Sequence, residues 1–159
     1  MTLDPVEFRN TLGSFATGVT IITTIGPDGD FVGFTASSFN SVSLDPPLIL
    51  FSLDRGARSL PAFQAASHFA INVLQRGQED LSNRFARRGE DKWAGVGYET
   101  WESGCPVFPD CLASFECRNF ASHEGGDHVI FVGAVERMIA HPEGEPLLFW
   151  RGNYCGTRA

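Results

Sequence analysis

The amino-acid sequence predicts a mainly β protein built around an antiparallel barrel, with helices at its periphery. Segments typical of strands follow one another along the chain, and the helical segments between them are few and short. The strand segments are amphipathic rather than uniformly apolar, which favours an antiparallel barrel. A chain of 159 residues has the length of one domain, and we expect residues 1–159 to form it.

The first predicted element is a helix that begins after Asp4. Asp4 can accept hydrogen bonds from the first free amides, Pro5 suits the first helical position, and Glu7 can complete a capping box. The residues that form its apolar stripe are Phe8, Leu12 and Phe15, and Gly18 ends the stripe.

The next segments predict strands and turns. Residues 19–25 are β-branched throughout, and a turn rich in glycine and proline leads from them into residues 31–34, which predicts a hairpin. Residues 41–47 are expected to form a connector rather than a central strand, because Pro46 and Pro47 have no amide hydrogen to donate. The remaining elements expected in this half are a buried strand at 48–53, a short helix that begins near Ser59 and Pro61, and a strand at 69–74.

The second half predicts one more helix and the longest strands. Residues 78–88 are polar, with Leu81 and Phe85 four apart on one side, which is typical of a surface helix. Residues 89–109 are expected to be an irregular loop, and a loop of this length in a compact domain is usually functional or part of an interface. The strands expected beyond it are 112–120 and 129–138, joined by 122–128, and a short last strand at 146–150.

Composition and charge exclude several classes of function. No apolar run approaches the roughly 20 residues of a membrane span, so we expect no membrane insertion. The net charge is −7, and the 12 basic residues form no cluster, so we expect no nucleic-acid partner. The 14 phenylalanines, against two tyrosines, indicate a heavily apolar lining that would suit a planar ligand or a large interface.

The N-terminal residues and the cysteines indicate a cytoplasmic protein. The first ten residues include Asp4, Glu7 and Arg9 and have no apolar stretch of the kind found in signal peptides. In the cytoplasm the four cysteines are expected to be reduced thiols, and without a Cys-x-x-Cys pair we expect no metal site. The positions expected to line one apolar strand face are Cys111, Ala113, Phe115 and Cys117.

Two segments have the residue types of a binding site for a flat, phosphorylated ligand. Residues 33–40 place small hydroxyl residues after a strand, so their main-chain amides could hydrogen-bond the polar edge of a heterocycle such as a flavin. The alternative is a Ser/Thr loop that satisfies its own turns. Arg55, Arg58 and Ser59 stand at a helix N-terminus, where an anion would be stabilised, although solvated arginines beside a capped helix are the alternative.

A third segment, residues 125–128, brings His128 to the start of a strand. A hydrolase that uses His128 would need a nucleophile and supporting residues, but the sequence has no Gly-x-Ser-x-Gly elbow and no Cys-His-Asn signature. His123, Asp127 and His128 are conceivable metal ligands, but no further donor stands at a familiar spacing. The alternative is that Asp127 holds a turn and His128 is half-buried.

The glycine pattern at Gly95 and Gly97 does not support a Rossmann fold. It follows no predicted strand, lacks a third glycine and lies among aromatic residues. A nucleotide site of that kind is therefore not expected.

Four segments in order along the chain show a resemblance to a known family. They are residues 8–22 (FRNTLGSFATGVTII), residues 33–53 (GFTASSFNSVSLDPPLILFSL), the Gly-Asp-His run at 126–128, and residues 146–154 (PLLFWRGNY). Together they resemble the flavin reductase family, the short-chain NAD(P)H:flavin oxidoreductases that serve two-component monooxygenases. The second segment is the most specific of the four.

The resemblance implies a fold, an activity and partners. The fold is a homodimeric, antiparallel split β-barrel of the FMN-binding type with a Greek-key core, which binds FMN or FAD near the subunit interface. The implied activity is hydride transfer from NADH or NADPH to the flavin, with reduced flavin diffusing to a partner flavin-dependent monooxygenase. Because hydride passes directly between the cofactors, no catalytic residue and no metal are expected.

The resemblance also implies the site residues. Those expected to bind the flavin are Gly33, Thr35, Ala36, Ser37, Ser38, Ser52, Leu53, Asp54, Arg55, Ser59, Arg84 and Phe85, and those expected to bind NAD(P)H are Asp127, His128 and Tyr154. Residues 35–38 would orient the ring and stabilise negative charge on its reduced pyrimidine edge. Arg55 and Ser59 would anchor the phosphate, and His128 would position the dihydronicotinamide.

Two alternatives to a reductase remain. A non-enzymatic FMN-binding electron carrier could use the same fold, with the nicotinamide pocket unused. A barrel that binds haem or a pyridoxal derivative is the other, although the segment at residues 33–53 does not favour it.

Overall fold

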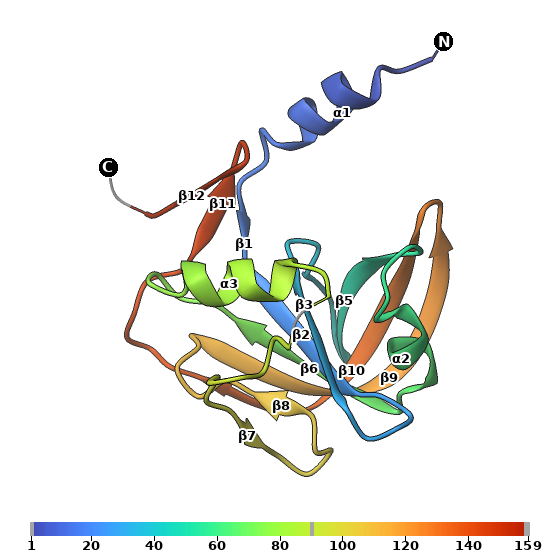
Figure 1. The fold of residues 1–159 in the computed structure, drawn as a ribbon, viewed down its shortest axis with the longest axis vertical. Coiled ribbons are helices and arrows are strands. Elements are labelled where there is room, and N and C mark those ends of the chain that lie inside the picture. The colour runs from blue at the N-terminus through green and yellow to red at the C-terminus, as the bar shows by residue number, and fades with distance from the viewer. Residues whose placement is uncertain (1, 90, 158–159) are drawn as a thin grey trace.

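The body of the protein is one curled antiparallel sheet of seven strands (Figure 1). The computed structural model describes residues 2–89 and 91–157. The strands lie in the order β3-β2-β6-β9-β10-β5-β4, and every neighbouring pair is antiparallel. Their bounds are β2 Thr20–Ile25, β3 Phe31–Ala36, β4 Asn40–Leu44, β5 Pro47–Asp54, β6 His68–Val73, β9 Ala113–Gly125 and β10 His128–Ala140. The predicted mainly β, antiparallel class is confirmed.

The two edge strands, β3 and β4, are consecutive in the chain although they stand at opposite ends of the sheet. Only residues 37–39 connect them, and a link this short spans no more than about 14 Å. The sheet therefore has to curl until its two edges approach each other at this link. No ladder joins β3 to β4 among the strands that the structure describes, so the sheet is not a closed barrel.

A cluster of phenylalanines fills the inside of the curl. Phe51 on β5 lies at its centre, with its ring centroid 4.9 Å from that of Phe69 and 5.1 Å from that of Phe131. Phe34 on β3 reaches the same cluster, 5.8 Å from Phe51 and 5.4 Å from Phe63. These contacts join strands from distant positions in the sheet, so aromatic packing stabilises the curl.

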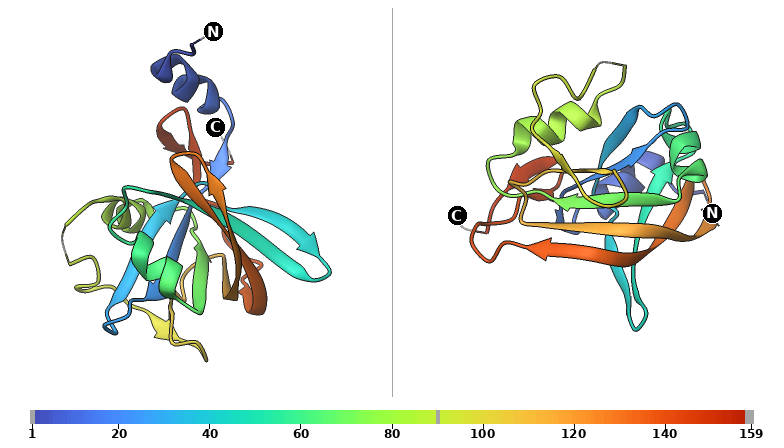
Figure 2. Two further views of the ribbon diagram at one scale, coloured as in Figure 1. Left: turned by 90° about the vertical axis from the view of Figure 1, so that its right-hand side faces the viewer. Right: turned by 90° about the horizontal axis from the view of Figure 1, so that it is seen from below.

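The helices that the structure describes are α1 Pro5–Leu12, α2 Leu60–Ala65 and α3 Glu79–Ala86, close to the three predicted positions. α1 begins as predicted, because Asp4 Oδ1 accepts hydrogen bonds from the amides of Val6 at 2.8 Å and Glu7 at 3.3 Å. α1 stands away from the sheet and has no buried residue, so its apolar stripe is exposed within this chain (Figures 1 and 2). No helix in the described part of the chain is long and apolar enough to cross a membrane.

Several predicted boundaries are wrong. Where the sequence predicts a connector at 41–47, the structure has the edge strand β4, which ends at Leu44 before the prolines. Pro46 lies in the turn after it, and Pro47 is the first residue of β5, a position where a strand tolerates proline. β5 is buried at alternate residues rather than throughout. β9 and β10 meet at a turn of residues 126–127, not at a longer loop. An unpredicted strand, β12 Asn153–Cys155, pairs with β11 Leu148–Trp150, and β1 Thr17–Gly18 completes this small second sheet. Inside the irregular loop, β7 Glu99–Thr100 pairs with β8 Pro106–Val107.

The outer face of β9 is also more buried than the alternation of its residues predicts. Cys117 is buried, but Phe115 is only partly so, whereas Ser114 and Glu116 on the other face are buried. The irregular loop covers this second face, because the amide and the hydroxyl of Ser103 donate to Glu116 Oε2 at 3.0 and 2.6 Å. β9 therefore lies between two packed layers, and its polar face needed partners that alternation alone does not reveal.

Candidate functional site

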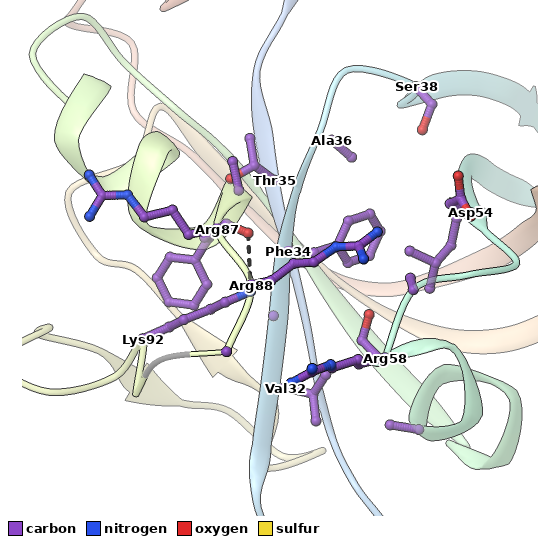
Figure 3. Close-up of a pocket in the computed structure, with 18 of the residues that line it drawn as sticks. Val32, Phe34, Thr35, Ala36, Ser38, Asp54, Arg58, Arg87, Arg88 and Lys92 are labelled. Atoms are coloured by element: carbon purple, nitrogen blue, oxygen red, sulfur yellow. Dashed lines mark hydrogen bonds between the residues drawn. The ribbon is translucent and has the colours of Figure 1, made fainter.

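A cleft of about 1200 Å³ opens between β3 on one side and the end of β5 with the turn before α2 on the other. The end of α3 and the segment after it close a third side, as Figure 3 shows. The cleft lies where the two halves of the curled sheet diverge from the link at residues 37–39. Its position therefore follows directly from the incomplete closure of the sheet.

The β3 wall presents main chain to the cleft. β3 pairs with β2 along one edge only, so half of its amides and carbonyls are free of the ladder. Gly33 on this strand is buried, and a Cβ added to it would lie 3.1 Å from the Phe85 ring and 3.3 Å from Trp93. Glycine lets the two rings pack directly against the strand, and a larger residue would push them away, so this packing joins α3 to the cleft wall.

The hydroxyls predicted to contact a ligand mostly bind the protein itself. Thr35 Oγ1 donates to the carbonyl of Ser82 on α3 at 2.6 Å. Ser38 Oγ accepts from the amide of Ser52 at 2.9 Å and lies 3.2 Å from its carbonyl oxygen, so it links residues 37–39 to β5. Ser37 is exposed, and its hydroxyl makes no hydrogen bond within the described residues. The wall can therefore offer a ligand the Ser37 hydroxyl and main-chain groups.

Basic side chains gather at the mouth of the cleft. Arg58 lies on the turn before α2, and Arg87, Arg88 and Lys92 follow α3. A Cβ placed on Gly89 would lie 3.9 Å from an Arg58 guanidinium nitrogen, so the two basic segments meet. Figure 3 shows Arg58 and Arg88 extending over the cleft from opposite walls. With the residues that the structure describes, none of the four basic side chains forms an ion pair.

The environment of Lys92 differs from that of the arginines. Its Nζ donates to the carbonyl of Phe85 at 3.4 Å, and partial burial lowers the pKa of this amine below its usual value. The cleft lining also holds three carboxylates, Asp30, Asp54 and Asp91. Asp54 Oδ1 accepts from the Gly56 amide at 2.6 Å and Asp91 Oδ1 from the Trp93 amide at 3.0 Å, and neither forms an ion pair with a described basic side chain. The four basic side chains therefore outnumber the acids of the lining by one, in a protein whose net charge is −7.

Arg55 does not line the cleft, although the sequence assigns it to a phosphate. Its Nε donates to the carbonyl of Gly126 at 2.9 Å, and its guanidinium lies 3.0 Å from Glu124. Arg58, three residues further on, lies in the cleft lining instead. The two arginines of this turn therefore face different surroundings.

His128 lies in the cleft lining, at the first residue of β10 and opposite Asp54 in the register with β5. Its Nδ1 is 2.7 Å from Asp127 Oδ1, and this contact with the histidine lowers the pKa of the Asp127 carboxyl. Asp127 therefore orients the ring, while Nε2 makes no hydrogen bond to any described residue. No group of three or more potential metal ligands occurs in the described part of the chain.

Two other predicted residues lie outside the cleft. Arg84 Nη1 donates to the carbonyl of Ala94 at 2.5 Å on the outer side of α3. The Tyr154 hydroxyl donates to Asn83 Oδ1 at 2.8 Å and lies 2.7 Å from the Ser82 hydroxyl. Tyr154 is therefore linked to the cleft only through Ser82, whose carbonyl accepts the hydrogen bond from Thr35.

The structure brings together eleven of the fifteen predicted site residues. Those in the cleft lining are Gly33, Thr35, Ala36, Ser37, Ser38, Ser52, Leu53, Asp54, Ser59, Phe85 and His128, and those outside it are Arg55, Arg84, Asp127 and Tyr154. Sequence reasoning missed Arg87, Arg88 and Lys92. The signal that could have found them is the pair of arginines at the end of the predicted helix at 78–88, in an otherwise acidic sequence.

Comparisons with known proteins assign the chain to a family. The flavin reductase like domain matches residues 12–158. "FMN reductase (NADH) SmoA" of Agrobacterium fabrum is 49% identical over 93% of this chain and 83% of its own length. The reductase subunit HsaB of a flavin-dependent monooxygenase from Mycobacterium tuberculosis is 43% identical over 97% of this chain and 83% of its own length.

A solved structure shows the same fold. The NADH:FAD oxidoreductase SgcE6 of Streptomyces globisporus, in complex with NAD and FAD fragments, superposes with a TM-score of 0.91. It is 37% identical in sequence, and the match covers 98% of this chain and 95% of that one. Because both the domain match and these relatives cover nearly the whole sequence, the chain belongs to the flavin reductase-like family.

Proposed function

We propose that this protein is an NAD(P)H:flavin oxidoreductase that transfers hydride from NADH or NADPH to FMN or FAD. The observation that carries the proposal is a single cleft that combines a free strand edge, a basic mouth and the His128–Asp127 pair. A flavin needs hydrogen-bonding groups along its ring and positive charge at its phosphate, and a nicotinamide needs a place beside the ring. The names of SmoA, HsaB and SgcE6 support the same activity.

The residues of the cleft fit a flavin. Ligand pockets usually measure about 300–1,000 Å³, so a cleft of about 1200 Å³ has room for a flavin and a nicotinamide ring together. The free edge of β3 and the Ser37 hydroxyl can serve the polar edge of the ring. Arg58 and Arg88 reach over the cleft without an ion pair to any described residue, and guanidinium groups bind phosphate through paired hydrogen bonds.

When bound, the flavin supplies the hydride-accepting ring, so the protein needs no general base. The main chain at residues 35–38 would orient the ring and stabilise the negative charge of its reduced form. Arg58 and Ser59 would hold the phosphate on one wall, and Arg88 and Lys92 on the other. His128, held by Asp127, would position the dihydronicotinamide at the rim.

One purification and one assay test the proposal. The visible spectrum of the protein as isolated shows whether flavin is bound, and the oxidation of NADH and of NADPH is then followed with and without added FMN or FAD. Turnover that depends on added flavin supports a reductase. Tightly bound flavin without turnover would contradict the reductase and favour the electron carrier on the same fold.

We also propose that the protein acts as a homodimer. α1 exposes Val6, Phe8 and Leu12, which are 62%, 52% and 59% accessible, and Phe15 just after it is 78% accessible. A second copy of the chain would cover this face. Leu12 lines the cleft as well, which would place the interface beside the flavin. Light scattering should give twice the chain mass, and Phe8→Asp should shift it toward the monomer; a wild-type monomer would contradict the proposal.

The remaining proposals concern the fold type and the setting of the reaction. We infer that residues 1–159 form a single split-barrel domain, in which the cleft is the opening of the barrel. The partner would be a flavin-dependent monooxygenase that receives reduced flavin by diffusion, as the HsaB name supports. The setting would be the cytoplasm, where the free cysteines stay reduced. Oxygenase activity that continues across a dialysis membrane would support transfer by diffusion.

A further inference from the structure

Arg55 joins two turns that lie far apart in the chain. The first turn leads from β5 into α2 and includes Arg58 and Ser59 of the cleft. The second is the turn at residues 126–127 between β9 and β10. The Arg55 amide donates to the Asp127 carbonyl at 2.9 Å, and its Nε donates to the Gly126 carbonyl at the same distance.

These contacts form the outer support of the second turn. Glu124, Gly126 and Asp127 are all exposed, and Gly126 has a φ of +71°, so the turn projects from the sheet. Among the residues that the structure describes, no side chain from outside the β9–β10 hairpin except that of Arg55 is hydrogen-bonded or ion-paired to it in this region. Without the Arg55 side chain, the β9–β10 ladder would still pair Gly125 with His128, and β5 would still be joined to the turn by the Arg55 amide and by the pairing of Asp54 with His128. The Arg55 side chain is thus the contact that fixes the Gly126 carbonyl from outside the hairpin.

The two side-chain contacts of Arg55 are unequal. Glu124 is 92% exposed, so its ion pair with the guanidinium is screened by solvent and contributes little. The hydrogen bond from Nε to the Gly126 carbonyl has a charged donor and a fixed acceptor, and it is the stronger of the two. It acts one residue from Asp127, which in turn orients the His128 ring through Nδ1.

We propose that Arg55 is a positioning residue that holds the Gly126–Asp127 turn in place and thereby sets His128 for the nicotinamide, and that it is not a ligand of the flavin phosphate. The inference rests on the proposed function. It assigns separate tasks to the two arginines of this turn: Arg58 binds the phosphate, and Arg55 positions the turn that carries His128. It also links the turn at the flavin phosphate to the turn that carries His128.

Two measurements distinguish an arginine that positions His128 from one that binds the flavin phosphate. Arg55→Ala should raise KM for NADH three- to tenfold, while the Kd for FMN, measured by flavin fluorescence without NADH, should change less than twofold. Arg76→Ala is the matched control, because Arg76 forms a surface ion pair with Glu145 at the same 3.0 Å and does not line the cleft. It should change neither constant. A parallel rise in the Kd for FMN of Arg55→Ala would overturn the inference and make Arg55 a phosphate ligand.

A double-mutant cycle tests whether Arg55 acts through His128. In a His128→Ala background, Arg55→Ala should change KM for NADH less than twofold, because its target is already absent. Additive effects would overturn the inference. If Arg55→Ala does not fold, Arg55→Lys tests the same point: it keeps the charge but loses the planar fork, so KM should rise at least twofold with FMN binding unchanged. An unchanged KM in Arg55→Lys would also overturn the inference.

The outcomes also separate this inference from the proposed function. A wild-type protein that neither binds flavin nor oxidises NADH contradicts the function itself. A wild-type reductase whose Arg55→Ala variant keeps its KM for NADH contradicts the role of Arg55 alone.

Discussion

The phenylalanine cluster inside the sheet and the basic mouth of the cleft adjoin at Phe34, which belongs to the cluster and also lines the cleft, but their side chains have different partners. The rings around Phe51 contact one another within 6 Å and have no polar atoms to pair. The guanidinium groups of Arg58 and Arg88 reach over the cleft without an ion pair in the described chain. If the basic mouth binds a ligand as proposed, substitutions in the first region should change stability and substitutions in the second should change binding.

The largest expected effect is on stability. Phe51→Ala removes the fully buried ring at the centre of the cluster and should lower the free energy of unfolding by about 3–5 kcal/mol, measured by urea denaturation. Phe120→Ala is the control, because Phe120 is 46% exposed and should cost less than about 1 kcal/mol. Equal losses in the two variants would contradict the assignment of the core.

Gly33→Ala tests the boundary between the two regions. The added methyl would lie 3.1 Å from Phe85, so overpacking should lower the free energy of unfolding by about 1–3 kcal/mol. Because Phe85 also lines the cleft, flavin affinity should fall as well. Gly18→Ala provides the comparison, since a Cβ there meets nothing within 4 Å, and it should leave both quantities nearly unchanged.

Arg58→Ala should affect binding without affecting stability. Removing one phosphate-binding guanidinium should raise the Kd for FMN about tenfold, or about 1.4 kcal/mol. The melting temperature should stay within about 2 °C of the wild type, because Arg58 is exposed and makes no ion pair in the described chain. Fluorescence titration and thermal denaturation measure the two effects. A large drop in melting temperature would show that the basic mouth is structural.

The smallest effect concerns pH. Burial lowers the pKa of Lys92, so this side chain loses its positive charge at a lower pH than an ordinary lysine. Flavin affinity should therefore decline as the pH rises, and the decline should begin below the usual range of lysine titration. In Lys92→Arg the decline should be absent, because a guanidinium stays protonated. An identical pH profile in the two proteins would exclude Lys92 from phosphate binding.

Local features of the fold were predictable because their causes are local. The hairpin of β2 and β3 follows from a β-branched run and a turn, and the start of α1 follows from the cap at Asp4. The proline argument at 46 and 47 misses β4 because that strand ends at Leu44, before either proline, and Pro47 itself begins the interior strand β5.

The site was predictable only where a contiguous segment forms it. Residues 33–38 and 52–54 line the cleft because each is a continuous run along β3 and the link after it or along the end of β5, and Ser38 joins the two runs by its hydrogen bonds with Ser52. The choice between Arg55 and Arg58 depends on Gly126, 71 residues away from Arg55, and no local pattern reports it. Similarly, the side chain of Tyr154 is directed by Ser82 and Asn83, which only the packing of β12 on α3 brings near.

The hydrogen bonds between Ser38 and Ser52 have a mechanical consequence. They fasten β5 to the short link between β3 and β4, at the narrow end of the cleft. If the cleft widens, these hydrogen bonds would therefore act as its hinge. The far end, where Arg88 and Lys92 follow α3, moves most in such a motion. Exchange of reduced for oxidised flavin would then take place at the end that bears the basic residues. The rate of this exchange should depend on salt concentration, whereas the contacts of the flavin ring should depend on it less.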